Sequence, residues 1–235
     1  MSGVCVKTTV MLVVLAGVGR GGMLVDYQAD AVPLDPWVRV SDGPPSERSQ
    51  HETFATGGVL TMIDSALFVG NTLGYYHLAA FDPETPLDVE FRARVLWGES
   101  ALGSMAPFSV WMYNGAVYAD MSVGPNSVTA IGAGPLLLNE MVDGTDWHTY
   151  RYRVGPQGID WWMDGEALGS ATTDMLIPHP TTVDRRINMM ITSASGYVEL
   201  DYLTVVPEPG TATLAILGLV LVGGRRRRFG SSLNV

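Results

Sequence analysis

Residues 146–166 of this 235-residue chain read DWHTYRYRVGPQGIDWWMDGE, and they decide its fold. Two runs rich in aromatic and β-branched residues, 147–154 and 159–163, flank a Gly-Pro-Gln-Gly segment. Such residues suit a pleated strand, while Gly and Pro mark turns. The stretch therefore predicts a β-hairpin, followed by a second turn at Asp164 and Gly165.

Strand signals continue on both sides of this hairpin. Residues 87–95 (LDVEFRARV) alternate apolar with charged side chains, and residues 108–113 (FSVWMY) run into Asn114-Gly115, a strong hairpin turn signal. Further strands are expected at 58–63, 116–123, 186–192 and 197–205. Helix signals are nearly absent outside the two termini. The sequence predicts an all-β body, residues 32–206, folded as one antiparallel β-sandwich.

The hairpin and the closing strand at 197–205 resemble those of concanavalin A-like lectin and glucanase jelly rolls, including laminin-G-like domains. The resemblance spans about residues 35–206 and implies a jelly-roll body. Its motifs are structural, so the fold follows from it more securely than the function does.

Two pairs of acids each share one strand face: Asp88 with Glu90, and Glu199 with Asp201. Retaining glucanases of this fold carry a Glu-x-Asp-x-x-Glu or Glu-x-Asp-x-Glu motif, which sets two carboxylates about 5 Å apart as nucleophile and acid/base. This chain lacks that motif. We therefore expect solvated acids on outer strand faces, no catalytic residue and no enzymatic activity.

Calcium is the candidate cofactor, because jelly rolls of the resembling family often hold one through carboxylates and carbonyls. The loops to consider carry Asp143, Asp146 and Asp164, although the same residues form good turns without a metal. Zinc is not indicated, since the four histidines are scattered without ligand spacing. These are His51, His77, His148 and His179.

Aromatic side chains offer the remaining sign of a ligand, because their faces stack on sugar rings. The candidates are Trp111, Tyr113 and Asn114 at a hairpin tip, Tyr75 and Tyr76, and the adjacent pair Trp161 and Trp162. Neighbours on a strand point to opposite sides, so one residue of the tryptophan pair faces the core and the other faces outward. The alternative is that all of them are core and turn residues of a large sandwich.

The C-terminal thirty residues carry Pro207-Glu208-Pro209, then an uncharged apolar segment at 211–224, then Arg225, Arg226, Arg227 and Arg228. Arginines stay on the cytoplasmic side of a membrane, so the bulk of the chain faces outward. The apolar segment spans roughly 21 Å as a helix, short of the roughly 30 Å hydrocarbon core. A core helix with a solvated basic tail is the alternative.

This order closely resembles the bacterial PEP-CTERM sorting domain, here over residues 207–230. In that family an exosortase, a membrane-embedded cysteine transpeptidase-like enzyme, acts near the Pro-Glu-Pro in bacteria that have an outer membrane and often make exopolysaccharide. The resemblance implies that Pro207, Glu208 and Pro209 are recognised by that enzyme. It also implies that the short membrane helix after them is transient.

The N-terminus predicts export as well. Lys7 precedes an apolar stretch at 8–19 that breaks at Arg20, the pattern of a secretory signal helix. We expect a signal peptide within residues 1–31, cleaved at Ala29-Asp30-Ala31 or near Val18-Gly19; a buried N-terminal strand or helix is the alternative. The only cysteine, Cys5, lies inside this segment, so the body has no disulfide.

The body is strongly acidic. Setting aside Lys7, Arg20 and the four terminal arginines leaves eight of the 14 basic residues, all Arg, against 24 Asp and Glu, a net charge of −16. This balance argues against nucleic acid and anionic lipid, which need clustered basic residues. It is compatible with calcium and with neutral or cationic glycans.

Together these features predict an exported cell-surface or extracellular-matrix protein that is sorted by an exosortase. The expected body is a non-catalytic module that binds carbohydrate, such as an extracellular polysaccharide. Two alternatives stay open: a glycoside hydrolase or lyase on the same fold, and a purely structural or adhesive protein.

Overall fold

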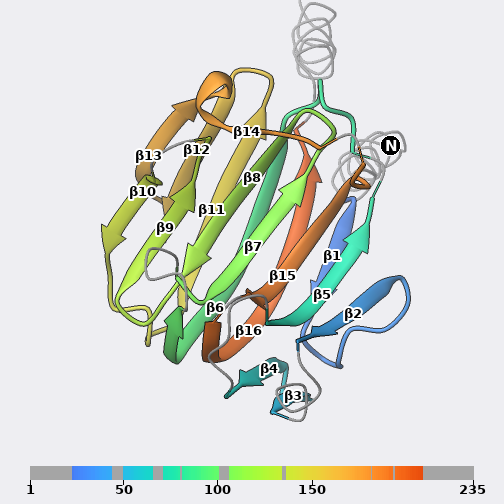
Figure 1. The fold of residues 1–235 in the computed structure, drawn as a ribbon, viewed down its shortest axis with the longest axis vertical. Coiled ribbons are helices and arrows are strands. Elements are labelled where there is room, and N and C mark those ends of the chain that lie inside the picture. Colours follow the sequence, from blue (N-terminus) through green and yellow to red (C-terminus); the bar gives the residue numbers. More distant parts are fainter. Residues whose placement is uncertain are drawn as a thin grey trace, which may run out of the picture.

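The computed structural model describes residues 23–43, 50–65, 71–79, 81–100, 106–133, 136–180, 182–192 and 194–208. Apart from the single-turn helix η1 (Thr173–Met175), every regular element in these ranges is a β-strand. The strands form two antiparallel sheets of eight that pack face to face (Figure 1). The predicted all-β sandwich of jelly-roll type is confirmed.

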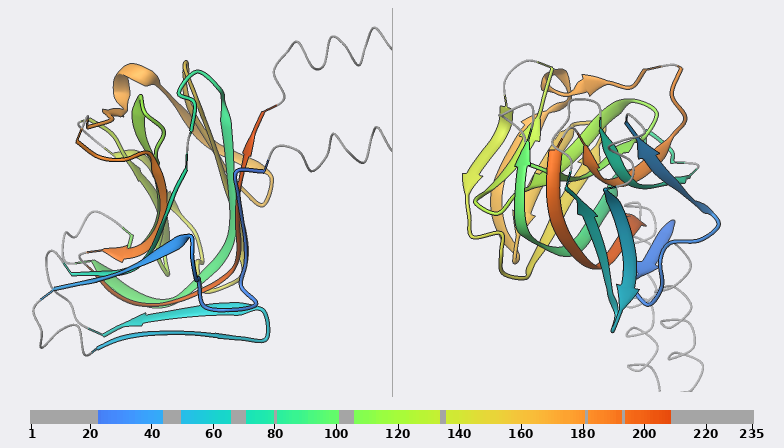
Figure 2. Two further views of the ribbon diagram at one scale, coloured as in Figure 1. Left: turned by 90° about the vertical axis from the view of Figure 1, so that its right-hand side faces the viewer. Right: turned by 60° about the horizontal axis from the view of Figure 1, so that its bottom comes forward.

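Sheet A contains the hairpin strands and both of the longest strands. In spatial order it comprises β13 (Glu166–Thr172), β12 (Gly158–Met163), β11 (His148–Gly155), β6 (Leu87–Ser100), β16 (Ala194–Pro207), β4 (Val59–Asp64) and β3 (His51–Thr56), with β1 (Val25–Gln28) also paired to β16. The strands β6 and β16 curve strongly, so that β3 and β4 lie beneath one end of the sandwich (Figure 2). Two register shifts in their pairing account for bending, because an extra residue kinks a strand.

Sheet B forms the other layer. Its order is β10 (Leu136–Met141), β9 (Ser127–Ile131), β8 (Val117–Val123), β7 (Phe108–Tyr113), β15 (Arg186–Thr192), β5 (Thr72–Leu78) and β2 (Trp37–Asp42), with β14 (Ile177–Pro178) also paired to β8.

The hairpin that dominates the sequence forms as predicted, with β11 and β12 in register from Tyr150 opposite Met163 to Gly155 opposite Gly158. Gly158 has a φ of 146°, and a Cβ there would lie 2.0 Å from the Ala171 carbonyl oxygen, so only glycine fits this turn.

The core fills the space between the sheets with aromatic and aliphatic side chains. Phe91 of β6 stacks on Tyr150 of β11 at 5.2 Å and meets Phe108 of β7 edge-on at 6.2 Å. All three are fully buried, and the second contact joins the two sheets. Edge-to-face and offset pairs of this kind add to the hydrophobic stabilisation of a core.

The first described strand belongs to the sandwich. Strand β1 pairs with the end of β16, and its Val25 and Tyr27 are buried against the core. Of the two expected cleavage positions, Ala29-Asp30-Ala31 would remove this strand, whereas Val18-Gly19 would leave it in place.

Several predicted features fall on residues outside the described ranges. They are the signal segment through residue 22, Pro209, the apolar segment 211–224 and Arg225, Arg226, Arg227 and Arg228. Within the ranges that are described, no helix has the length and apolar character needed to cross a membrane.

Candidate functional site

Aromatic side chains gather on the outward face of sheet B, over strands that lie side by side at the front of Figure 1. Tyr113 on β7 is in register with Tyr118 on β8 and with Arg186 on β15, and Trp111 lies two residues earlier on the same face. Tyr76 adds a ring from β5. We name these five residues the aromatic-arginine face: Tyr76, Trp111, Tyr113, Tyr118 and Arg186.

The guanidinium of Arg186 lies among the rings of this face. Its central carbon is 5.0 Å from the ring centre of Tyr76, 5.6 Å from that of Trp111 and 5.9 Å from that of Tyr113. Cation-π attraction over these distances orients the guanidinium. The Nε atom of Arg186 is buried and has no hydrogen-bond partner among the described residues.

The rings meet edge-on or tilted rather than flat. Trp111 meets Tyr113 at 5.2 Å with an interplanar angle of 81°, and Tyr113 meets His179 at 5.1 Å with an angle of 85°. Trp111, Tyr113, Tyr76 and Arg186 remain partly exposed. The arrangement gives a partly exposed group of rings that is ordered by contacts with Arg186 and between the rings.

A buried carboxylate lies beside the aromatic-arginine face. Asp120 of β8 accepts hydrogen bonds from the Ile131 amide at 3.0 Å and from the Ser122 hydroxyl at 3.3 Å. Burial raises its pKa to about 7, although both hydrogen bonds act in the opposite direction. It is the only carboxylate on the outward sides of β5, β7, β8 and β15, whereas glycoside hydrolysis by the usual route needs two.

Three of the seven candidates for an aromatic platform, Tyr76, Trp111 and Tyr113, come together here, and the others do not. Tyr75 is buried in the core. Trp161 is fully buried and donates its indole N–H to the Asp120 carbonyl at 2.9 Å, so it is a core residue. Trp162 lies on the outward side of sheet A, stacked at 5.0 Å under the guanidinium of Arg151. Asn114 is buried as well.

The role of Asn114 is to shape the turn between β7 and β8. Its side-chain oxygen accepts the amide hydrogens of Ala116 and Val117, both at 2.9 Å. The turn therefore uses the side-chain oxygen of Asn114 as an acceptor. A contribution of Asn114 to a ligand platform stays a prediction.

The three aspartates considered for calcium surround a histidine instead. His148 Nδ1 lies 2.6 Å from an Asp164 carboxylate oxygen, and His148 Nε2 lies 3.0 Å from the Asp143 carbonyl oxygen. The side chain of Asp143 accepts from the amide and hydroxyl of Thr145. Asp146 contributes charge near His148. Across the described ranges no group of three or more His, Cys, Asp or Glu side chains is arranged to hold a metal ion.

Replacing Asp164 by asparagine is expected to lower the pKa of His148. Burial depresses that pKa, but the bonds to Asp164 and to the Asp143 carbonyl, with the nearby negative charges, raise it above its ordinary value. Asparagine tolerates the positive φ of 52° at this position and can still accept from the Thr149 amide. Titration of the imidazole by NMR measures the change, with Asp26→Asn on β1 as the control. An unaltered His148 titration in Asp164→Asn would contradict this assignment.

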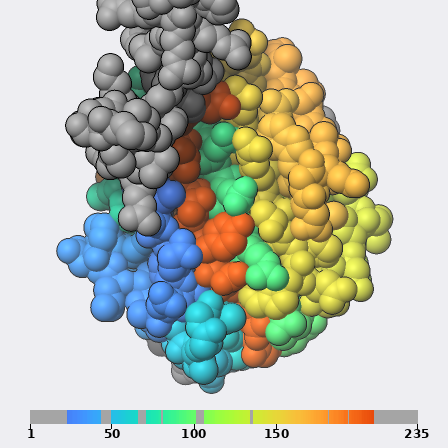
Figure 3. Space-filling view, turned by 180° about the vertical axis from the view of Figure 1, so that it is seen from behind, coloured from blue at the N-terminus to red at the C-terminus, as the bar shows by residue number. Residues whose placement is uncertain are grey.

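The two acid pairs lie on the outward side of sheet A, where they meet basic and tyrosine partners. Asp88 binds Arg151 at 2.8 Å, and the Tyr202 hydroxyl donates to Glu90 at 2.9 Å. In the second pair, Glu199 binds Arg94 at 2.6 Å and Asp201 binds Arg92 at 2.8 Å. Figure 3 shows this face, with β16, β6 and β11 side by side. Three of its acids form ion pairs with arginines, and Glu90 accepts from a tyrosine.

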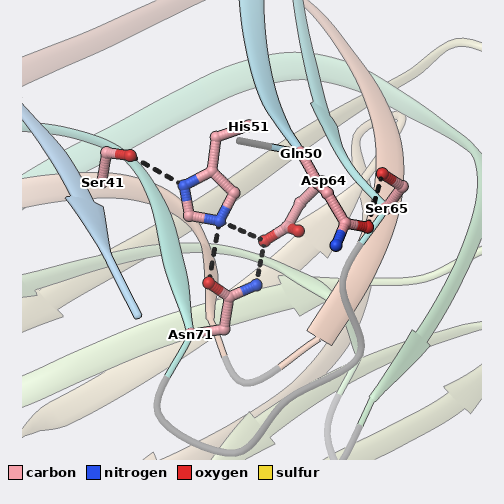
Figure 4. A network of polar contacts seen from close by, with 6 residues as sticks. All are labelled: Ser41, Gln50, His51, Asp64, Ser65 and Asn71. Atoms are coloured by element: carbon pink, nitrogen blue, oxygen red, sulfur yellow. Dashed lines mark hydrogen bonds and ion pairs between the residues drawn. The ribbon is translucent and has the colours of Figure 1, made fainter. Parts of the chain in front are cut away.

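A separate polar cluster joins β2, β3, β4 and the start of β5 (Figure 4). His51 Nε2 lies 2.8 Å from Asn71 Oδ1 and 3.3 Å from Asp64 Oδ2, and His51 Nδ1 lies 2.8 Å from the Ser41 hydroxyl. Ser, His and Asp in contact suggest a hydrolase triad. However, the side chains of His51 and Asp64 are 0% exposed, so no substrate reaches the imidazole. The cluster is therefore a cross-link between strands.

Comparison with known proteins identifies the C-terminal signal and the fold. Residues 205–228 match the PEP-CTERM protein-sorting motif. No curated protein sequence matches the chain.

Three solved structures illustrate the likeness of the body. An endo-acting O-glycanase of the human gut microbiota is 14% identical, with 80% of this chain and 100% of that chain covered and a TM-score of 0.55. A carbohydrate esterase from Shiga toxin-encoding bacteriophage phi24B is 13% identical over 80% and 99% of the two chains, with a TM-score of 0.54. An endo-1,3-β-glucanase from Thermotoga petrophila is 12% identical over 80% and 98%, with a TM-score of 0.51.

At these identities the three structures show the fold alone. The sorting motif indicates where the protein is sent, because PEP-CTERM proteins are processed by an exosortase. This chain is an exported protein with a PEP-CTERM sorting motif and a jelly-roll body, held at the membrane and then delivered to the cell surface of a bacterium with an outer membrane.

Proposed function

We propose that the body is a non-catalytic carbohydrate-binding module that uses the aromatic-arginine face. The observation that carries this proposal is the group of partly exposed rings around the partly exposed guanidinium group of Arg186. Ring faces stack on the apolar sides of sugars, and guanidinium N–H groups donate to hydroxyl oxygens. The single buried acid beside the face favours binding over hydrolysis.

The charge of the body indicates the class of glycan. With a net charge of −16 between the two sorting segments, the body repels polyanions, so we expect a neutral extracellular polysaccharide. Similar folds include an endo-1,3-β-glucanase, which makes neutral β-glucan a reasonable first probe.

Trp111→Ala is expected to weaken binding by roughly 30-fold, the effect of losing an aromatic contact worth about 2 kcal/mol. The loss of affinity is measured by affinity electrophoresis of the full chain in gels that contain soluble 1,3-β-glucan. An array of neutral, cationic and acidic oligosaccharides then tests the other glycan classes. Trp162→Ala is the matched control, since it removes an indole from the opposite sheet. Retention of wild-type affinity in Trp111→Ala would rule out this face.

The same experiment distinguishes the other two functions. Release of soluble sugar from the polysaccharide would favour a glycoside hydrolase. No binding to any glycan class would favour a structural or adhesive protein.

A further inference from the structure

The last strand of the body continues directly into the sorting motif. Pairing of β16 with β6 extends to Val206 opposite Asp88 and Pro207 opposite Leu87. One residue further, the Glu208 amide donates to the Pro86 carbonyl at 2.9 Å. The first two residues of the Pro-Glu-Pro sequence are therefore bound to sheet A.

The side chain of Glu208 is held as well. Its carboxylate forms an ion pair with the guanidinium of Arg153, which lies on the outward side of β11 next to β6. The two side chains are 25% and 40% exposed, respectively, so water and salt reach the pair. The neighbouring outward arginine, Arg151, is paired with Asp88, whereas Glu208 is paired with Arg153.

A hollow opens beside this pair. Arg153 and Pro86, both in contact with Glu208, line a cavity of about 700 Å³ bordered by the β11–β12 turn and by Asp160. The pair thus lies at the rim of an open groove, where it can separate without disturbing the core.

We propose that Arg153 and Pro86 form a holding site for the sorting motif, and that the exosortase acts only on molecules in which Glu208 has left it. An enzyme that binds Glu208 must compete with its ion pair to Arg153 and with its backbone hydrogen bond to Pro86. Its apparent affinity for the folded protein is its intrinsic affinity multiplied by the fraction of molecules in the open form. The folded body thereby sets the rate of its own sorting, whatever ligand it binds.

The test measures how fast the full chain is processed in a bacterium that carries its exosortase. Pulse-chase labelling detects processing as the loss of the C-terminal segment. Arg153→Gln is expected to be processed about two to five times faster, because a partly exposed ion pair contributes a factor of that size. Arg151→Gln, which removes a similar ion pair from the same strand, should match the wild type. Arg153→Lys keeps the charge and should stay close to the wild type.

A second readout checks the mechanism before processing. Hydrogen exchange of the Glu208 amide in the full chain should be faster in Arg153→Gln than in Arg151→Gln, with similar melting temperatures for both. Processing of Arg153→Gln at the wild-type rate, or more slowly, would overturn the proposal. So would equal acceleration in Arg153→Gln and Arg151→Gln, which would indicate general loosening of the sheet.

Discussion

Trp161→Ala is expected to lower the free energy of unfolding by about 3 to 5 kcal/mol, the usual cost of truncating a buried tryptophan. Trp161 is the largest of the fully buried side chains, and its indole N–H binds the Asp120 carbonyl across the two sheets. Alanine would leave a cavity and a carbonyl without its donor. Urea unfolding of the full chain, monitored by circular dichroism, measures the loss.

Trp162→Ala is the matched control, since it removes the same side chain one residue further along β12. Trp162 points outward and contacts Arg151 by stacking, so its removal should cost about 1 kcal/mol or less. If Trp162→Ala proved as destabilising as Trp161→Ala, the assignment of the two faces of β12 would be incorrect.

Asp120→Asn is expected to stabilise the protein at pH 8 by up to about 4 kcal/mol, while leaving it nearly unchanged at pH 4. Burial raises the folded-state pKa of Asp120 to about 7, so the folded protein holds a proton that the unfolded chain releases near pH 4. The contribution of protonated Asp120 to the free energy of unfolding is therefore fully present below pH 4, falls as the pH rises and is lost above about pH 7. Asparagine does not titrate and can still accept from Ile131.

Unfolding of wild type and Asp120→Asn should be compared at several pH values between 4 and 8. The difference in their unfolding free energies should grow with pH. A difference that is the same at pH 4 and pH 8 would show that Asp120 has an ordinary pKa.

Strand positions were predictable from the sequence because they depend on local alternation. Residues 87–95, 108–113 and 186–192 all form strands as expected, since their apolar residues recur at every second position and face one core. The β11–β12 hairpin followed equally from its glycines. Eight of the sixteen strands were not predicted, because short segments carry too little alternation; they are β1, β2, β3, β5, β9, β10, β13 and β14.

The candidate site was only partly predictable, because it depends on register between strands far apart in the chain. Nothing local indicates that Arg186 would meet Tyr76 and Trp111 from two other strands. A possible signal was the alternation of Arg186 and Asn188 with apolar residues, which marks an outward polar face. Choosing between Trp161 and Trp162 required the direction of β12 relative to the core, which adjacency alone leaves open.

The pairing of β1 with β16 determines how the protein can be shortened for study. Val25 lies opposite Val205, so the first and last described strands are neighbours in one sheet. A recombinant form that begins at residue 32 would lack β1 and expose the flank of β16, an unpaired strand edge that invites aggregation. Expression boundaries placed upstream of Val25 and downstream of Glu208 keep that flank covered.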